Sequence, residues 1–295
     1  MIAPHGGEET RVSFRRRAGW VRPLLAAALV ITMTTTAGCG DPEVEPDPAE
    51  YLSGEVLIGI NTDLPGWSEY ANGVWQGFDI SLSNWLGEEL GFQPRFVNLT
   101  TNERVTALQG ADSDVKLVIS NFSINDKRRK DIDQVGPYLT DSQGLLTLKT
   151  SKIAKVEDIE RKNICTALGS TTEQRLFGIT INPLTENTLQ RCMERLRAGE
   201  ADAVSSDRVI LEGFIAHDTA GDIRLVPGIR VGSERYGIGI RNDHPKLCAY
   251  LAKKLVKFIN EEWDRTFKDN LPNVVPTDRK PNSAALDPCE QPVTG

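Results

Sequence analysis

A short polar segment, Ser123-Ile124-Asn125-Asp126-Lys127-Arg128, carries the side chains in this sequence that are best suited to hold a charged small molecule. It follows an apolar run, residues 117–120, that predicts a buried strand. A guanidinium is always charged, and its planar fork matches the two oxygens of a carboxylate. Because open α/β sheets bind ligands at the carboxyl ends of their strands, Arg128 is placed to hold a ligand carboxylate. The alternative is a solvated charge cluster, since residues 127–130 are all basic.

The N-terminal residues predict an exported lipoprotein. Four arginines between residues 15 and 22 precede a short apolar run, residues 24–31, which is the layout of a secretory signal and too short to span a membrane. Small residues then lead to Cys39, as in a bacterial lipobox. We expect residues 1–38 to be removed and Cys39 to carry a lipid anchor containing palmitate on the extracytoplasmic face of the cell membrane. An ordinary cleaved signal peptide with an incidental cysteine is the alternative.

Length and charge restrict the partners. The chain has 295 residues and a net charge of −7, which becomes −10 without residues 1–38, because that segment holds five arginines and two acidic residues. An acidic body argues against nucleic acid or an anionic lipid surface as a partner. The length is sufficient for a large core in two domains. Residues 39–51 form an acidic, proline-rich tether that we expect to be extended.

Four cysteines beyond the lipobox, Cys165, Cys192, Cys248 and Cys289, predict two disulfides in an exported protein. Three pairings are possible. We favour Cys165–Cys192 and Cys248–Cys289, because each pair is then local to one region, and the second would attach the C-terminal tail, residues 272–295, to the preceding helix. Buried free thiols are the alternative. We expect no metal site, since there is no C-x-x-C pair and the chain has three His.

Strands and helices alternate along the rest of the chain. Apolar runs predict strands at residues 55–60, 94–99, 115–120, 163–167, 201–205 and 235–240. Helical spacing predicts helices at residues 79–90, 102–109, 171–177, 188–198, 207–217 and 245–269. This order predicts an α/β fold with a mostly parallel sheet. Two crossings, near residues 144–149 and 232–240, would make a hinged cleft between two α/β lobes.

Six short motifs, in this order, make the sequence similar to family 3 extracellular solute-binding proteins, the amino-acid receptors of ABC importers. They are Gly77-Phe78-Asp79-Ile80, Leu108-Gln109-Gly110, the segment from Ser123 to Arg128, Gly136-Pro137-Tyr138, Gly169-Ser170-Thr171-Thr172 and Ala201-Asp202-Ala203-Val204. The resemblance covers roughly residues 54–271, and the turn at residues 63–66 is most similar to the glutamate-type receptors of actinobacteria.

The resemblance implies a type 2 periplasmic binding fold, with two α/β lobes joined by a two-strand hinge. The implied boundaries are residues 52–146 and 237–271 for lobe 1, residues 147–236 for lobe 2 and residues 272–295 for the tail. Arg128 matches the arginine that binds the ligand α-carboxylate, and Asp207 matches the carboxylate that binds the α-ammonium. Asn121 and Ser123 match ligand-contacting positions of lobe 1.

In lobe 2, Ser170 and Thr171 match a pair of donors at a helix N-terminus, where free N–H groups favour an anion. Trp67 is expected to stack on the ligand. Each assignment has an alternative: Asp207, Ser170 and Thr171 could cap helices, and Trp67, like Tyr70 and Trp75, could fill ordinary core.

The implied function is to bind an amino acid, with a polar or acidic side chain favoured, and to deliver it to an ABC permease. This protein would be a monomer without a cofactor. A sensory or regulatory lipoprotein of the same fold is one alternative, and a dehydratase is another, which would need a general acid or base that faces the ligand. Two departures from the family pattern, at residues 133–135 and in a polar insertion at residues 111–114, leave the sensory alternative open.

Overall fold

The computed structural model describes residues 45–110, 113–175 and 180–289. The predicted signal segment, Cys39 and the first part of the tether lie outside these described residues. None of the helices described here has both the length and the apolar character needed to cross a membrane.

One mixed sheet organises the described chain. Its strands follow the spatial order β5-β1-β6-β12-β7-β10-β8-β9, and β11 pairs with β7. The strands are β1 (Gly54–Ile60), β5 (Phe92–Asn98), β6 (Val115–Val118), β7 (Ile132–Leu148), β8 (Asn163–Ala167), β9 (Asn182–Glu186), β10 (Ala203–Asp207), β11 (Ile223–Leu225) and β12 (Val231–Arg241). β1 pairs in parallel with β5 and β6, and β8 pairs in parallel with β9 and β10. The sheet therefore has two parallel parts.

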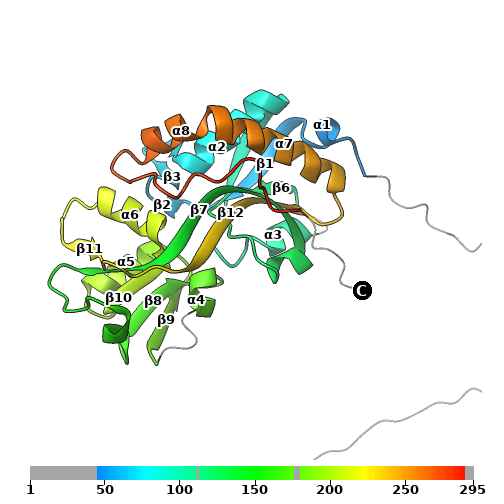
Figure 1. The fold of residues 1–295 in the computed structure, drawn as a ribbon. Helices are drawn as coiled ribbons and strands as arrows, with labels where there is room; N and C mark the ends of the chain where they lie inside the picture. Colours follow the sequence, from blue (N-terminus) through cyan, green and yellow to red (C-terminus); the bar gives the residue numbers. More distant parts are fainter. Residues whose placement is uncertain (1–44, 111–112, 176–179, 290–295) are drawn as a thin grey trace, which may run out of the picture. The chain divides into compact units, whose positions relative to one another are not determined.

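Two long strands connect these parts. β7 and β12 pair antiparallel, and β7 continues into pairing with β10 and β11. Figure 1 shows β7 and β12 running side by side from the region of β1 and β6 to the region of β10. Most of β7 is buried, so its side chains belong to the core along the crossing.

Helices cover both parts of the sheet. α2, α7 and α8 contact one another near β1, whereas α5 and α6 contact β10 (Figure 1). The helices are α1 (Pro48–Tyr51), α2 (Phe78–Leu90), α3 (Thr106–Gln109), α4 (Thr171–Arg175), α5 (Leu189–Arg197), α6 (Arg208–Ala216), α7 (Pro245–Glu261) and α8 (Trp263–Asn270), with short 3₁₀ turns at Arg128–Lys130 and Val156–Ile159. Amphipathic spacing explains α7, whose Leu251, Leu255 and Phe258 are fully buried.

The structure contains both disulfides in the expected pairing. Cys165 of β8 is bonded to Cys192 of α5, with 5.5 Å between their Cα atoms. Cys248 of α7 is bonded to Cys289 of the tail, with 6.1 Å between their Cα atoms. Both separations are normal for a disulfide.

The described part of the tether corrects one prediction, because it is docked rather than extended. Asp47 accepts a hydrogen bond from the backbone N–H of Ala49 and caps α1. The carboxylate of Glu45 accepts hydrogen bonds from the N–H groups of Lys246 and Leu247, at 3.1 and 3.0 Å. These groups begin α7, and a negative charge is favourable at the N-terminus of a helix.

Other regions differ from the sequence prediction, and three of them show why. The single helix expected at residues 245–269 is broken at Glu262, where Trp263 turns so that its indole N–H donates to the Tyr138 carbonyl at 2.8 Å. The helix expected at residues 102–109 is limited to α3. A small three-stranded sheet occupies a region expected to be a loop; its strands are β2 (Asp63–Leu64), β3 (Ser68–Ala71) and β4 (Val74–Gln76). Tertiary contacts decide all three, and local spacing does not reveal them.

Candidate ligand-binding site

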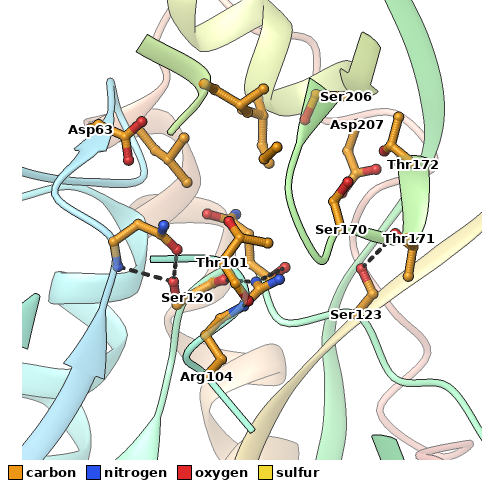
Figure 2. A pocket seen from close by; sticks show the side chains of 16 residues that line it. Asp63, Thr101, Arg104, Ser120, Ser123, Ser170, Thr171, Thr172, Ser206 and Asp207 are labelled. Carbon is orange, nitrogen blue, oxygen red and sulfur yellow. Dashed lines mark hydrogen bonds between the residues drawn. The ribbon is translucent and has the colours of Figure 1, made fainter. Parts of the chain in front are cut away.

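A small polar cavity lies where the carboxyl ends of β1 and β6 face those of β8 and β10 (Figure 2). We call the lining residues between 61 and 123 the first wall and those between 167 and 210 the second wall. The first wall consists of Asn61, Asp63, Leu64, Thr101, Arg104, Ser120, Asn121 and Ser123. The second wall consists of Ala167, Ser170, Thr171, Thr172, Leu189, Ser206, Asp207 and Ile210. The cavity volume is about 30 Å³, enough for about two water molecules and far too small for an amino acid. An amino acid therefore requires the two walls to move apart.

Five of the seven residues that the sequence assigned to ligand binding line this cavity: Asn121, Ser123, Ser170, Thr171 and Asp207. The hydroxyls of Ser123 and Thr171 approach each other across the cavity at 3.5 Å (Figure 2). The positions that follow β6, β8 and β10 thus come together, as expected for the carboxyl ends of parallel strands.

Asn121 is held in an unusual backbone conformation by a buried network. Its φ is +44°, in the left-handed region that few residues other than glycine adopt. Its N–H contacts the Asp79 carboxylate at 3.0 Å and the Tyr138 hydroxyl at 3.1 Å. The Tyr138 hydroxyl also donates to Asp79 at 2.9 Å. Burial raises the pKa of Asp79 to about 7, and these hydrogen bonds oppose the rise.

The side-chain amide of Asn121 is available to a ligand. Both its Nδ2 and its Oδ1 are buried and have no hydrogen-bond partner among the described residues. A buried polar group without a partner is costly, so a ligand that pairs with this amide would recover free energy.

Arg128 is not one of the lining residues; it lies behind the first wall, through its contact with Ser123, and we count it with that wall. One terminal nitrogen donates to the Ser123 carbonyl at 2.6 Å, and the other donates to the Gly169 carbonyl of the second half of the sheet at 3.1 Å. Its guanidinium also lies 4.7 Å from the centre of the Phe122 ring. Burial lowers the pKa of Arg128 to about 9, and repulsion from Arg104 adds to this effect.

Trp67 is not part of the cavity. It is fully buried, its indole N–H donates to the Val209 carbonyl at 3.2 Å, and its ring packs against Phe78, Tyr236 and Phe267. This is the core position that the sequence left as the alternative. The loop around Trp67 forms β2 and β3, which turn the ring inward.

Asp207 presents an open carboxylate oxygen to the cavity. Oδ2 accepts a hydrogen bond from the Tyr236 hydroxyl at 2.6 Å, whereas Oδ1 is buried and has no partner in the described chain. Asp207 occupies the position before α6, but its side chain caps none of the helix N–H groups described there. Burial raises the pKa of Asp207 well above its ordinary value, and the charges of Glu234 and Asp141 raise it further. A ligand ammonium would relieve this unfavourable burial.

The hydroxyl groups of Ser170 and Thr171 both form hydrogen bonds within the protein. The Ser170 hydroxyl accepts a hydrogen bond from the Glu173 N–H at 3.0 Å, and Glu173 accepts one from the Gly169 N–H at 2.7 Å, as in a capping box. The Thr171 hydroxyl donates to Glu234 at 3.1 Å. Ser170 therefore caps α4, and both residues also line the cavity.

Arg104 is a cavity residue that sequence reasoning missed. It is 5% exposed and donates to the carbonyls of Thr101, Ser120 and Asn121 at 3.0, 2.7 and 3.3 Å. Its guanidinium lies 4.7 Å from the centre of the Phe122 ring, the same distance as that of Arg128. Burial lowers the pKa of Arg104 to about 10. It stands before α3 in a polar stretch, where nothing in the residue pattern marks it as buried.

The charges of the cavity suit a ligand with charges of both signs. Neither Arg104 nor Arg128 forms an ion pair with any residue that the structure describes, and Asp207 keeps one oxygen open. Buried charges without partners are unfavourable, so the site gains from a ligand carboxylate near the arginines and a ligand ammonium near Asp207. No group of three or more His, Cys, Asp or Glu side chains in the described ranges is placed to hold a metal ion.

Comparison with known proteins gives a consistent result. The model of bacterial extracellular solute-binding proteins, family 3, matches residues 56–271. A glutamate-binding protein of Corynebacterium efficiens is 29% identical over 266 residues, which cover 83% of this chain and 88% of that protein. A glutamine-binding protein of Geobacillus stearothermophilus is 28% identical over 211 residues, which cover 67% of this chain and 77% of that protein.

The solved structures agree in fold. An ancestral arginine-binding protein bound to arginine superimposes with a TM-score of 0.68 at 24% identity, and the match covers 74% of this chain and 98% of that one. The predicted fold class, an α/β protein of the type 2 periplasmic binding fold, is therefore confirmed.

Proposed function

This chain belongs to family 3 of the bacterial extracellular solute-binding proteins, and from this premise we propose that it binds an amino acid for delivery to an ABC importer. The proposal concerns binding and transport without chemistry on the ligand. It agrees with the functions of its relatives, which include glutamine- and glutamate-binding proteins.

The observation that carries this proposal is the separation of buried charge across the cavity. Arg104 and Arg128 lie on the side of the first wall and form no ion pair with a described residue, whereas Asp207 stands on the opposite wall with an open oxygen. An α-amino acid carries a carboxylate and an ammonium close together and can pair with both sides at once. A ligand with a single charge would leave one side unpaired.

We assign the α-carboxylate to Arg128 together with Ser123 and the α-ammonium to Asp207. The Asn121 amide is placed to pair with either polar group of the ligand. Arg104 would then meet the ligand side chain, because it adds a second buried cation to the same wall. This arrangement favours a side chain that ends in a carboxylate or an amide.

A thermal-shift screen of the purified protein against the standard amino acids tests the proposal. A ligand that binds only the folded state stabilises it by about 2.7 kcal/mol at a concentration one hundred times its Kd. We expect the largest rise in melting temperature with glutamate, glutamine, aspartate or asparagine, and a clearly smaller rise with the same ligand when Asp207 is replaced by Asn. A folded protein that responds to none of the amino acids would overturn the proposal.

We also propose that Cys39 carries the lipid that keeps the receptor at the membrane. The lipobox-like residues before Cys39 and the secretory layout of residues 1–38 are the support for this anchor. In cells of the source bacterium, Cys39→Ser should move the protein from the membrane fraction to the medium or the soluble extracytoplasmic fraction. Retention of Cys39→Ser in the membrane fraction would contradict lipid anchoring.

A further inference from the structure

The C-terminal tail, residues 272–289, lies along β7, one of the two strands that connect the halves of the sheet. The N–H and the hydroxyl of Thr140 donate to the carbonyls of Arg279 and Asp278, at 2.9 and 2.8 Å. Farther along the tail, the N–H of Asp287 donates to the Gly136 carbonyl at 2.7 Å. The tail lies beyond residue 271, where the match to the family ends. Its contacts with β7 are therefore an addition of this chain to the part that the family model describes.

Arg279 joins this tail to two carboxylates on different elements, one buried and one partly exposed. The side chain is 5% exposed. One terminal nitrogen lies 3.0 Å from Asp141 of β7, and the other lies 2.8 Å from Glu212 of α6. Its Nε donates to the Val275 carbonyl at 3.1 Å, so all three nitrogens of the guanidinium are engaged. Only the planar fork of an arginine can hold two carboxylates in this way.

Asp141 supplies the cap that α6 lacks. The side chain of Asp207, at the usual capping position, makes no capping hydrogen bond. Instead the second oxygen of Asp141 accepts a hydrogen bond from the N–H of Val209, in the first turn of α6, at 2.6 Å. Burial raises the pKa of the Asp141 carboxyl, and the positive charge of Arg279 opposes this rise. The two oxygens of Asp141 thus connect Arg279 directly to the start of α6.

We propose that Arg279 is a positioning residue for the ligand-ammonium site. It fixes Asp141 and Glu212, Asp141 caps α6 in place of Asp207, and the freed carboxylate of Asp207 keeps one oxygen for the ligand. Without Arg279, Asp141 loses its partner and the first turn of α6 loses its fixed cap. Asp207 then turns back toward the helix N–H groups, which compete with the ligand for the same oxygen.

This inference rests on the proposed function, and a double-mutant cycle tests it. Dissociation constants for the amino acid found in the thermal-shift screen are measured for the wild type, Arg279→Met, Asp207→Asn and the double variant. We expect Arg279→Met to weaken binding about tenfold in the wild-type background and less than twofold in the Asp207→Asn background, because both changes act on one carboxylate. Lys280→Met is the matched control, since Lys280 is the next residue of the tail and pairs with Asp264 at 2.6 Å. It should bind like the wild type.

Two results would overturn the proposal. The first is an unchanged affinity in Arg279→Met. The second is an equal loss in both backgrounds, which would mean that Arg279 only stabilises the fold. Should Arg279→Met fail to fold, Arg279→Lys replaces it, because a lysine keeps the charge but can satisfy only one of the two carboxylates at a time. Arg279→Lys should then weaken ligand binding by less than tenfold, and this loss should be absent in the Asp207→Asn background. Wild-type affinity in Arg279→Lys would refute the positioning role.

A ligand-free measurement separates this inference from the proposed function. Hydrogen exchange of the Val209 amide should be at least tenfold faster in Arg279→Met than in the wild type and Lys280→Met. If no amino acid binds the wild type, the proposed function fails, and faster exchange at Val209 would still show that Arg279 holds the start of α6. If amino acids bind and exchange at Val209 is unchanged, the positioning role fails alone.

Discussion

The buried arginines and the open carboxylate of the cavity lie on different sides and are held by different means. On the first side, Arg104 and Arg128 donate to backbone carbonyls and have no ion-pair partner among the described residues. On the second side, Asp207 receives a hydrogen bond from Tyr236 and keeps an open oxygen. Figure 2 shows Arg104 and Asp207 reaching the cavity from opposite sides.

This difference explains how binding can be coupled to closure. The arginines of the first side and Asp207 of the second form no ion pair with each other, so a ligand with both charges gains its full electrostatic stabilisation only when both walls surround it. The direct contacts between the two sides, such as Ser123 with Thr171 at the cavity and Arg128 with Gly169 behind it, involve neutral partners on at least one side. The ligand is therefore expected to supply the charged contacts of the closed state.

Removal of the Arg128 cation should have the largest effect. Arg128→Met keeps the apolar stem and deletes the partner of the ligand carboxylate, so we expect binding to weaken by roughly 2–5 kcal/mol, or at least thirtyfold. Isothermal titration calorimetry with the amino acid found in the screen measures the loss. Lys127→Met, at the exposed neighbouring position, is the control and should bind normally. An unchanged Kd in Arg128→Met would show that Arg128 does not hold the ligand carboxylate.

The second prediction concerns the stability contributed by Asp79, whose carboxylate holds the backbone of Asn121 in the first wall. The pKa of Asp79 is about 7 in the folded protein, against 3.8 for an ordinary aspartate. At a pH between these two pKa values, Asp79 is protonated in the folded state and ionised in the unfolded state. The contribution of Asp79 to stability therefore falls as the pH rises from about 4 to about 7. The change over this window is as much as about 4 kcal/mol.

Urea unfolding of the wild type and Asp79→Asn between pH 4 and pH 8 tests this expectation. The wild type should lose stability relative to Asp79→Asn as the pH rises, and the difference should level off above pH 7. Glu88→Gln, an exposed change on the same helix, should follow the wild type. Parallel curves for Asp79→Asn and the wild type would show that Asp79 does not titrate in this window.

Local pattern predicted the parts of the site that follow strands. The apolar runs of β6, β8 and β10 were visible in the sequence, and the polar residues directly after them, such as Asn121 and Asp207, could be placed at one edge of the sheet. The disulfide pairs could be chosen because each joins segments close in the chain. These features depend on spacing, which a sequence displays directly.

Tertiary packing decided what the sequence did not reveal. Trp67 turns into the core because β2 and β3 redirect its loop, and Arg104 is buried although it stands in a polar stretch. The capping of α6 by Asp141 joins residues 68 positions apart. The tail was expected to be attached by a disulfide, but the burial of Arg279 between two carboxylates has no local signature.

The charge of the second wall gives a third prediction. Burial raises the pKa of Asp207, and a ligand ammonium lowers it, so binding should expel a proton when Asp207 is protonated in the free protein. Affinity should therefore rise with pH until Asp207 is ionised without ligand. Asp207→Asn should weaken binding by about 1.5–3 kcal/mol, the range for a hydrogen bond to a charged group.

Calorimetry in two buffers with different ionisation enthalpies measures this proton directly. The wild type should show a binding enthalpy that depends on the buffer, and Asp207→Asn should not. Ser206→Ala, a neutral change at the neighbouring lining residue, should keep the proton release. Buffer dependence that survives in Asp207→Asn would assign the proton to another group and leave the second wall without its proposed charge.

The smallest effect should be one of selectivity, and it tests whether the two cations of the first wall have separate tasks. If Arg128 holds the α-carboxylate and Arg104 meets the side chain, Arg104→Met should weaken binding of an acidic amino acid about tenfold more than binding of its amide, because only the acidic ligand loses an ionic partner. Competition titrations with glutamate and glutamine measure this ratio. Arg95→Met, on the exposed edge of β5, is the control and should not change it. Equal losses for both ligands would mean that Arg104 only supports the Ser120 and Asn121 carbonyls, and that the first wall distinguishes amino acids by other groups.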